Sequence, residues 1–225
     1  MGSRKTDPRV VRTRSAVMSA ARALFLARGY AGTTMDDIAE HAGITKRTLY
    51  NNYQDKEQLF MEIVSDATTF AETFARDLPT MLGAASRAAD LRASLQEFAV
   101  RLARAIVRDE VVSLRRLLVG EARTFPSLGR HYFKRAPAQV ITSLASEFAR
   151  LRGIGLLVMG DERRAATQFA YLVVGAPLDQ AMLTGKIPPD DEVQSCALEG
   201  VATFLARYGN TTLATRRNDE HGSAR

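Results

Sequence analysis

The apolar residues of this chain recur mainly at spacings of three and four positions, the period of an α-helix, and seldom in strict alternation. This pattern predicts a first helix over 10–28, with apolar residues on one face and arginines on the other. The longer helical segments after it are 56–77, 91–106, 111–123, 128–151 (with a break expected at Pro137), 161–184 and 189–208. The stretch 153–160 could form a strand, but a lone strand would have no partner, so we interpret it as a helix end and a loop. The predicted fold class is all-α.

Two short helices are predicted between the first helix and the segment 56–77. Thr34, with Asp37 three residues later, forms an acidic variant of the capping box and would open the first of them. Gly43 would end that helix, because glycine accepts a left-handed backbone without strain. Thr45 can then cap the second short helix.

The spacing within this pair is typical of a helix-turn-helix. Ala39 falls where the two helices would cross, and Gly43 lies in the turn four residues later. Ile44 and Leu49 would be buried and would fix the crossing. Together with the first helix, the pair predicts a small amino-terminal three-helix unit, followed by a larger helical unit.

The positive charge of the chain is concentrated at its amino-terminal end. The 225 residues carry a formal net charge of +6, and the sequence pI is about 9.8. Residues 1–28 hold seven cations and one acid, so they account for the whole net charge and the remaining residues sum to about zero. A basic segment of this kind favours a polyanionic partner.

The second short helix has the side chains that suit DNA. Lysine and arginine can donate hydrogen bonds to guanine and asparagine can pair with adenine, while hydroxyls suit phosphate oxygens. A solvated charged face on a helical hairpin is the alternative, and the turn spacing together with the flanking helices argues against it. The predicted DNA-binding residues are Thr33, Thr34, Thr45, Lys46, Arg47, Thr48, Tyr50, Asn51, Asn52, Tyr53 and Lys56.

Residues 12–60 resemble the DNA-binding domain of the TetR family of one-component transcriptional regulators. The resemblance is carried by the run FLARGYAGTTMDDIAEHAGITKRTLYNNYQDKEQLF. It implies that residues 45–48 contact bases or nearby phosphates, while Tyr50 and Lys56 hold the DNA backbone. Asn51 and Asn52 stand where the family often has an aromatic residue or a histidine, so the operator need not resemble that of any relative.

The run RRLLVGEARTFPSLGRHYF, residues 115–133, is similar to the carboxy-terminal domain of the AefR-like subgroup of the family. In such proteins this half usually holds a small-molecule pocket and forms the dimer. We therefore expect a DNA-binding domain over 9–55, a linking helix over 56–77 and an effector-binding and dimerisation domain over 78–209. The tails 1–8 and 210–225 are expected to be flexible.

An apolar and aromatic set in the carboxy-terminal half is either core or pocket wall, which spacing alone cannot separate. The polar residues Arg115, Glu121 and Arg123 lie among this set, and they would either orient a polar ligand group or face solvent. The candidate ligand-binding residues are Phe98, Leu102, Leu118, Glu121, Phe125, Phe133, Leu144, Phe148, Phe169 and Leu172.

A homodimer is expected through the last two long helices, since one helix-turn-helix covers only a few base pairs. The final helix carries a strip of small residues flanked by apolar ones, which could instead pack on its own chain. The candidate interface residues are Val174, Leu178, Cys196, Ala197, Gly200, Val201 and Phe204.

Other chemistries find little support in the sequence. The single cysteine, Cys196, excludes an intramolecular disulfide and is interpreted as a packed thiol rather than a redox sensor. His131 is interpreted as part of a helix face rather than a ligand contact or pH switch. The three histidines lie far apart in sequence, so the sequence does not indicate a zinc site. No apolar run approaches the length of a membrane span, and we expect a cytoplasmic protein without a cofactor.

Three functions are compared on this basis. The first is a ligand-responsive repressor that binds a palindromic or pseudo-palindromic operator and is released by a small molecule of unknown identity. The second is an architectural DNA binder, which would have weak sequence preference and no cavity. The third is a small helical enzyme, for which no converging acid, base or metal group can be found. The first is our prediction.

Overall fold

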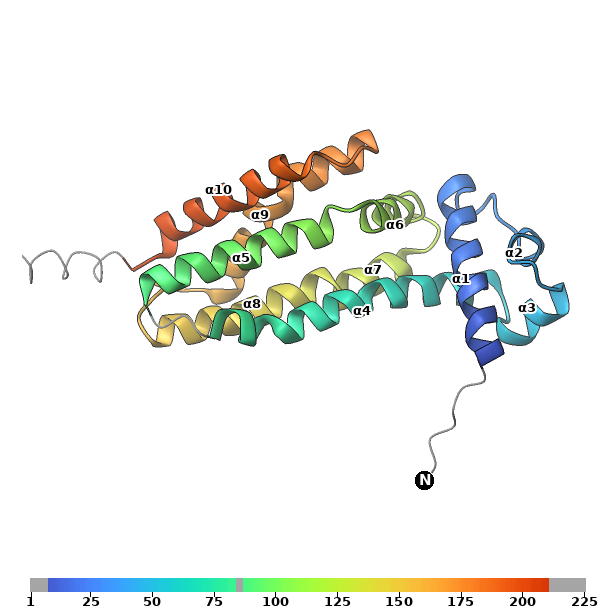
Figure 1. The fold of residues 1–225 in the computed structure, drawn as a ribbon, viewed down its shortest axis with the longest axis horizontal. Coiled ribbons are helices and arrows are strands. Elements are labelled where there is room, and N and C mark those ends of the chain that lie inside the picture. The colour runs from blue at the N-terminus through green and yellow to red at the C-terminus, as the bar shows by residue number, and fades with distance from the viewer. Residues whose placement is uncertain (1–7, 84–86, 211–225) are drawn as a thin grey trace, which may run out of the picture. The chain divides into compact units, whose positions relative to one another are not determined.

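The computed structural model describes residues 8–83 and 87–210, and within these residues all regular structure is helical (Figure 1). The helices are α1 Pro8–Arg28, α2 Met35–His41, α3 Lys46–Asn52, α4 Lys56–Gly83, α5 Ala88–Ile106, α6 Asp109–Gly120, α7 Pro126–Arg135, α8 Pro137–Gly153, α9 Glu162–Thr184 and α10 Asp190–Tyr208. The all-α prediction is confirmed. The tails predicted to be flexible lie almost wholly outside the described residues.

Most predicted helix boundaries agree with the structure, and α4 is the main exception. It continues through Pro79 to Gly83, past the predicted end near residue 77. Proline removes a backbone donor and usually disfavours a helix interior. Here Leu78 and Leu82, on either side of Pro79, are fully buried, so their packing holds this turn helical. The predicted break at Pro137 is confirmed, because Ala136 leaves the helical conformation and Pro137 starts α8.

The described residues form two compact units. The first contains residues up to 69 together with 113–132, and the second contains 70–112 together with 133 onward. The predicted boundary near residue 78 does not anticipate this division, in which residues 113–132 group with the helix-turn-helix. These residues supply Leu114, Leu118 and Leu128 to the core of the first unit, where all three are buried.

The core of the first unit is built around an aromatic cluster. Phe25 of α1 lies 5.2 Å from Phe60 of α4 between ring centroids, and Tyr30 lies 5.0 Å from Phe60. Phe125 completes the cluster with its ring edge-on to Tyr30 at 4.6 Å. The apolar stripe predicted for 10–28 therefore packs inward, together with Ile38 and Leu49 of the two short helices.

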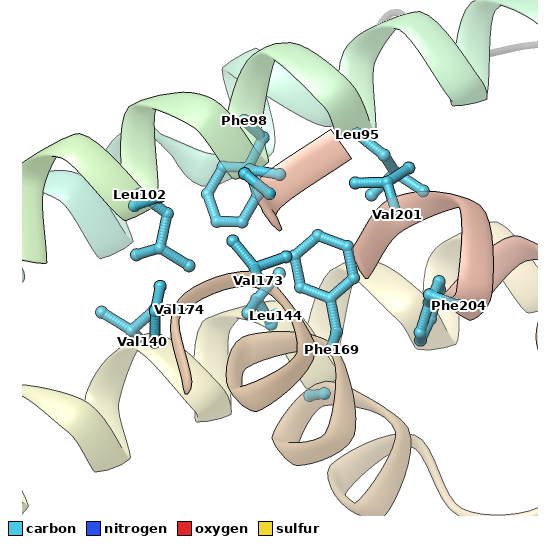
Figure 2. Packing of buried hydrophobic residues seen from close by; sticks show 14 of the residues in the cluster. Leu95, Phe98, Leu102, Val140, Leu144, Phe169, Val173, Val174, Val201 and Phe204 are labelled. Atoms are coloured by element: carbon cyan, nitrogen blue, oxygen red, sulfur yellow. The ribbon is translucent and has the colours of Figure 1, made fainter. Parts of the chain in front are cut away.

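The second unit is a bundle in which α9 packs against α8 and α10, and α10 packs against α5. Figure 2 shows apolar side chains from these four helices pointing toward one another. Four phenylalanines form a chain of ring contacts between 5.0 and 6.0 Å: Phe98, Phe169, Phe148 and Phe204. Edge-to-face pairs such as Phe169 with Phe204 add to the free energy gained by burying the rings.

The segment 153–160 forms a turn rather than a strand, as predicted. Gly155 adopts a φ of +76°, and the chain then runs beside the end of α10. The Val158 amide donates to the Tyr208 carbonyl at 2.8 Å, and the Asn210 amide donates to the Leu156 carbonyl at 3.1 Å. The result is one isolated bridge, Leu157 with Gly209, within the described part of the chain.

The small-residue strip of α10 packs on its own chain, which corrects its assignment to a dimer seam. Ala197, Val201 and Phe204 are fully buried in the single chain. A Cβ placed on Gly200 would lie 2.7 Å from the Leu172 carbonyl oxygen of α9. Gly200 therefore serves the close approach of α9 and α10 within one chain.

Replacing Gly200 with alanine should lower the free energy of unfolding by about 1–3 kcal/mol, because the new methyl group meets backbone atoms that cannot rotate away. Gly175→Ala is the matched control in α9, since a Cβ there meets nothing within 4 Å. That control should be neutral or stabilise the helix by up to about 1 kcal/mol. Chemical denaturation measures both, and equal effects would contradict a close approach at Gly200.

Candidate DNA-binding site

The helix-turn-helix is held by a short set of buried contacts. Gly43 adopts a φ of +66°, which a larger residue would resist, and so lets the chain reverse between α2 and α3. The Ile44 amide donates to the Ala39 carbonyl at 3.0 Å across this turn. Ala39 and Leu49 are almost completely buried where the helices meet. The predicted positions of Ala39, Gly43 and Leu49 are thus confirmed.

Both short helices begin with the predicted caps. The Asp37 amide donates to the Thr34 hydroxyl at 3.1 Å, and the Thr34 amide donates to the Asp37 carboxylate at 2.9 Å. The Thr34 hydroxyl also donates to this carboxylate, which holds the pKa of Asp37 below its ordinary value. At the start of α3 the Thr48 amide donates to the Thr45 hydroxyl at 3.2 Å. These bonds satisfy amides that the first turn of a helix leaves unpaired.

The surface of α3 carries most of the predicted DNA-binding side chains. Five of them on α3 are exposed, as is the capping residue Thr45, while Thr48 is half-buried; the exposed residues of α3 are Lys46, Arg47, Tyr50, Asn51 and Asn52. Tyr50 is 51% exposed although it is aromatic. Arg47 has no hydrogen-bond or ion-pair partner within residues 8–83 and 87–210, so its guanidinium is available to a ligand.

Two exposed side chains of α3 already have partners in the chain. The Asn52 amide group donates to the Thr48 carbonyl at 2.7 Å, which turns it back along the helix. The Lys46 ammonium forms an ion pair with Asp36 of α2 at 2.6 Å. Thr34 is exposed at the start of α2, and its hydroxyl is used in the cap.

Three predicted phosphate ligands have structural roles that sequence reasoning missed. Thr33 is fully buried, and its hydroxyl donates to the Gly29 carbonyl at 2.9 Å. Tyr53 is 4% exposed, and its hydroxyl donates to Glu62 at 3.3 Å. Burial raises the pKa of Tyr53. The structure therefore does not present the hydroxyls of Thr33 and Tyr53 to DNA.

Lys56 is the third of these residues. Its half-buried ammonium donates to the carbonyls of Tyr30 and Thr33, both at 2.7 Å, and lies 4.2 Å from the centroid of the Tyr30 ring. An ammonium has three donors, so two of the three are already used. Burial raises the pKa of Tyr30 to about 12, so this ring stays neutral beside the lysine.

An ion network joins the first helix to this site. The Arg14 guanidinium donates to Glu62 of α4 at 2.5 Å, and Glu62 also accepts the Tyr53 hydroxyl. Arg14 is 48 positions from Glu62 in sequence, so nothing in the local pattern could have signalled the pair. Arg14 belongs to the basic segment 1–28 that is expected to favour a polyanionic partner, and in the structure its guanidinium is paired with a carboxylate of α4.

The candidate ligand-binding residues do not converge on one cavity. Five are packed in the core of the second unit: Phe98, Leu102, Leu144, Phe148 and Phe169. Three belong to the first unit, where Leu118 is buried and Phe125 packs on Tyr30, while Glu121 lines a surface groove of about 380 Å³. Phe133 and Leu172 are exposed, and Leu172 lines a second groove of about 470 Å³ beside Tyr171 and Arg207.

The structure also bears on Cys196 and His131, and on metal sites and membrane-spanning helices. Burial raises the pKa of the Cys196 thiol, the opposite of the shift that makes a cysteine reactive. His131 is half-buried, and its Nε2 has no hydrogen-bond partner within the described residues. The described residues hold no cluster of three potential metal ligands. No helix among them combines the length and apolarity needed to cross a membrane.

Two parts of the chain match sequence models of known protein families. Residues 17–63 match the sequence model of bacterial regulatory proteins of the tetR family, and residues 93–210 match the C-terminal domain of AefR-like transcriptional repressors. The second match alone covers just over half of the chain. The chain belongs to the TetR family of transcriptional regulators.

Solved structures agree with this membership over nearly the whole chain. A protein from Mesorhizobium loti MAFF303099, described as a TetR-family transcriptional regulator, is 32% identical, with a TM-score of 0.79 over 90% of this chain and 100% of its own. The flavonoid-responsive regulator FrrA is 28% identical, with a TM-score of 0.69 over 88% of this chain and 98% of its own. This TetR-family regulator therefore has an amino-terminal helix-turn-helix and a helical carboxy-terminal domain.

Similarity to individual curated relatives extends over a short part of the chain. The HTH-type transcriptional repressor BepR of Brucella suis is 36% identical over 64 residues, which are 28% of this chain and 31% of BepR. The chain thus matches about a third of the length of that relative. These similar proteins are regulators of transcription, and TetR-family regulators bind operator DNA, usually as dimers.

Proposed function

We propose that this TetR-family regulator is a repressor that binds a palindromic or pseudo-palindromic operator as a homodimer and leaves it when a small molecule binds. The observation that carries the proposal is the row of exposed side chains on α3, above a buried and capped scaffold. In this row Tyr50 is half-exposed, and Arg47 has no polar partner among the residues that the structure describes. Recognition helices of this class place their first residues against base edges in the major groove. Repression is supported by the AefR-like repressor match and by the name of BepR.

The ligand-responsive part of the proposal rests on the carboxy-terminal half. FrrA, which is similar over 88% of this chain, is described as flavonoid-responsive. The second unit offers aromatic surroundings for a ligand of that kind, with Phe98 and Phe169 in contact at 6.0 Å. A ligand that inserts there has to open the packed core, which supplies the change in helix arrangement that release from DNA requires. We take polyphenolic aromatic molecules as the first class to test.

The homodimer is proposed through the outward faces of α9 and α10. Tyr171, Leu172 and Arg207 line the groove of about 470 Å³ between these helices. Leu183 lies eleven residues beyond Leu172, about three helical turns, so both project from one face of α9. Leu183 is 78% exposed and Leu172 38% exposed in the single chain. A second copy related by a two-fold axis would cover this apolar surface.

An architectural DNA binder is the alternative, and a footprint separates the two. A repressor protects a defined operator, whereas an architectural protein protects sequences with little preference.

Arg47→Ala should weaken operator binding by about 1–3 kcal/mol and relax the sequence preference, because a guanidinium that donates to guanine carries base information. Tyr50→Phe should weaken all sequences about equally, since a phosphate contact carries none. Binding selection from random DNA, run on both variants, measures the difference. An unchanged preference in Arg47→Ala would contradict its role in reading bases.

Addition of a flavonoid should lower the affinity of the protein for its selected DNA, and DNA should lower the affinity for the flavonoid by the same factor. Calorimetry of the protein with a flavonoid panel, with and without DNA, measures both sides of this linkage. A sugar of similar size is the control. Tight flavonoid binding with no effect on DNA would reject these molecules as inducers.

Leu172→Glu should convert the dimer to monomers and reduce operator affinity, because the carboxylate would be buried in the apolar seam. Val119→Glu is the matched control at another exposed apolar residue, 66% exposed in α6. Sedimentation measures the association state of each. A Leu172→Glu protein that stays dimeric would place the interface elsewhere.

A further inference from the structure

The ion pair between Asp36 and Lys46 links the first turns of the two helices of the helix-turn-helix. Lys46 is the first residue of α3, and its ammonium lies 2.6 Å from the Asp36 carboxylate of α2. The turn at Gly43 and the bond from Ile44 to Ala39 bring the two residues together. The side chain of Lys46 is 67% exposed and that of Asp36 is 51% exposed, so DNA can reach the pair.

Asp36 differs from its neighbour Asp37 in what it contacts. Asp37 belongs to the cap of α2, where it accepts bonds from both the amide and the hydroxyl of Thr34. The Asp36 carboxylate instead accepts a hydrogen bond from the Lys46 ammonium of α3. Both acids lie in the first turn of α2, where the helix dipole favours a carboxylate. In the structure Asp36 in addition forms an ion pair with the first residue of α3.

We propose that Asp36 is a specificity-determining residue of the DNA interface, which restrains Lys46 and so weakens binding to nonoperator DNA. Nonspecific affinity grows with the number of cations that neutralise phosphates, and a lysine paired with a carboxylate adds little to that number. A free lysine is a flexible point charge that satisfies any nearby phosphate. Asp36 therefore lowers the affinity mainly for nonoperator DNA, where no contact to a base compensates for the weakened phosphate contact of Lys46.

The same pair is compatible with reading an operator. An ammonium carries three donors, so Lys46 can keep one bond to Asp36 and direct the others to acceptors on a guanine edge. Asp36 thereby lowers nonspecific binding more than operator binding. This inference rests on the proposed insertion of α3 into the major groove.

The test compares Asp36→Asn with Glu40→Gln, which removes the same charge from an exposed residue of α2 that has no lysine partner within the described chain. Binding is measured to the selected operator and to an equally long duplex of unrelated sequence, over a range of salt concentrations. Asp36→Asn should raise affinity for the unrelated duplex by roughly 3- to 10-fold at low salt. It should also steepen the salt slope by about one. The ratio of operator to unrelated affinity should fall.

A second pair of variants isolates Lys46. In a Lys46→Gln background, Asp36→Asn should change binding no more than Glu40→Gln does, because the restrained cation is gone. Equal effects of Asp36→Asn and Glu40→Gln, or a full effect without Lys46, would show a general charge effect and overturn the proposal. Asp36→Ser repeats the comparison if the asparagine disturbs α2, as judged by thermal unfolding.

Failure of the underlying function has a different signature. If Lys46→Gln and Arg47→Ala both bind the operator as the unmodified protein does, α3 is not the reading helix and the role of Asp36 is rejected with it. If both variants bind poorly while Asp36→Asn leaves the affinity ratio unchanged, the reading helix stands and the inference about Asp36 alone is overturned.

Discussion

The ammonium of Lys56 holds the DNA-binding unit together at the point where three of its helices meet. It stands at the first residue of α4 and binds the carbonyls of Tyr30 and Thr33, which lie between α1 and α2. Those carbonyls belong to a loop, where helical hydrogen bonds cannot satisfy them. The same ammonium lies over the ring of Tyr30. This ring in turn contacts the rings of Phe25, Phe60 and Phe125. The position of the start of α2 therefore depends on this contact, and the position of α3 depends on it through α2.

From this anchor, polar contacts divide the surface of the helix-turn-helix between structure and recognition. Thr33, Tyr53 and Lys56 turn inward and stabilise the unit, although their chemistry would equally suit phosphate. Arg47 and Tyr50 remain directed to solvent. A lysine or a hydroxyl that fits both roles is held by the protein where it satisfies a carbonyl shielded from water, because an unpaired buried carbonyl costs more free energy than a water-exposed bond gains.

The second unit follows a different physical rule, because dense apolar packing rather than polar contacts sets its helices in place. Gly200 lets α10 approach the backbone of α9, and the phenylalanine rings fill the space between these helices and α5 and α8. A polar link reinforces it, since Arg104 of α5 forms a bidentate pair with Asp190 at the start of α10. A packed interior of this kind responds to a ligand by switching arrangement rather than by deforming gradually.

The sequence by itself determined the all-α class, the caps at Thr34 and Thr45, the turn at Gly43 and the exposed face of α3, because each depends on local period or on residues a few positions apart. Only the tertiary structure decided that Lys56 binds Tyr30 and Thr33, that Arg14 meets Glu62, and that residues 113–132 pack with the helix-turn-helix. The same holds for the strip around Gly200, whose period fits a dimer seam and a contact within one chain equally well. Contacts between residues far apart in sequence leave no local pattern, since a buried face looks the same whichever surface covers it.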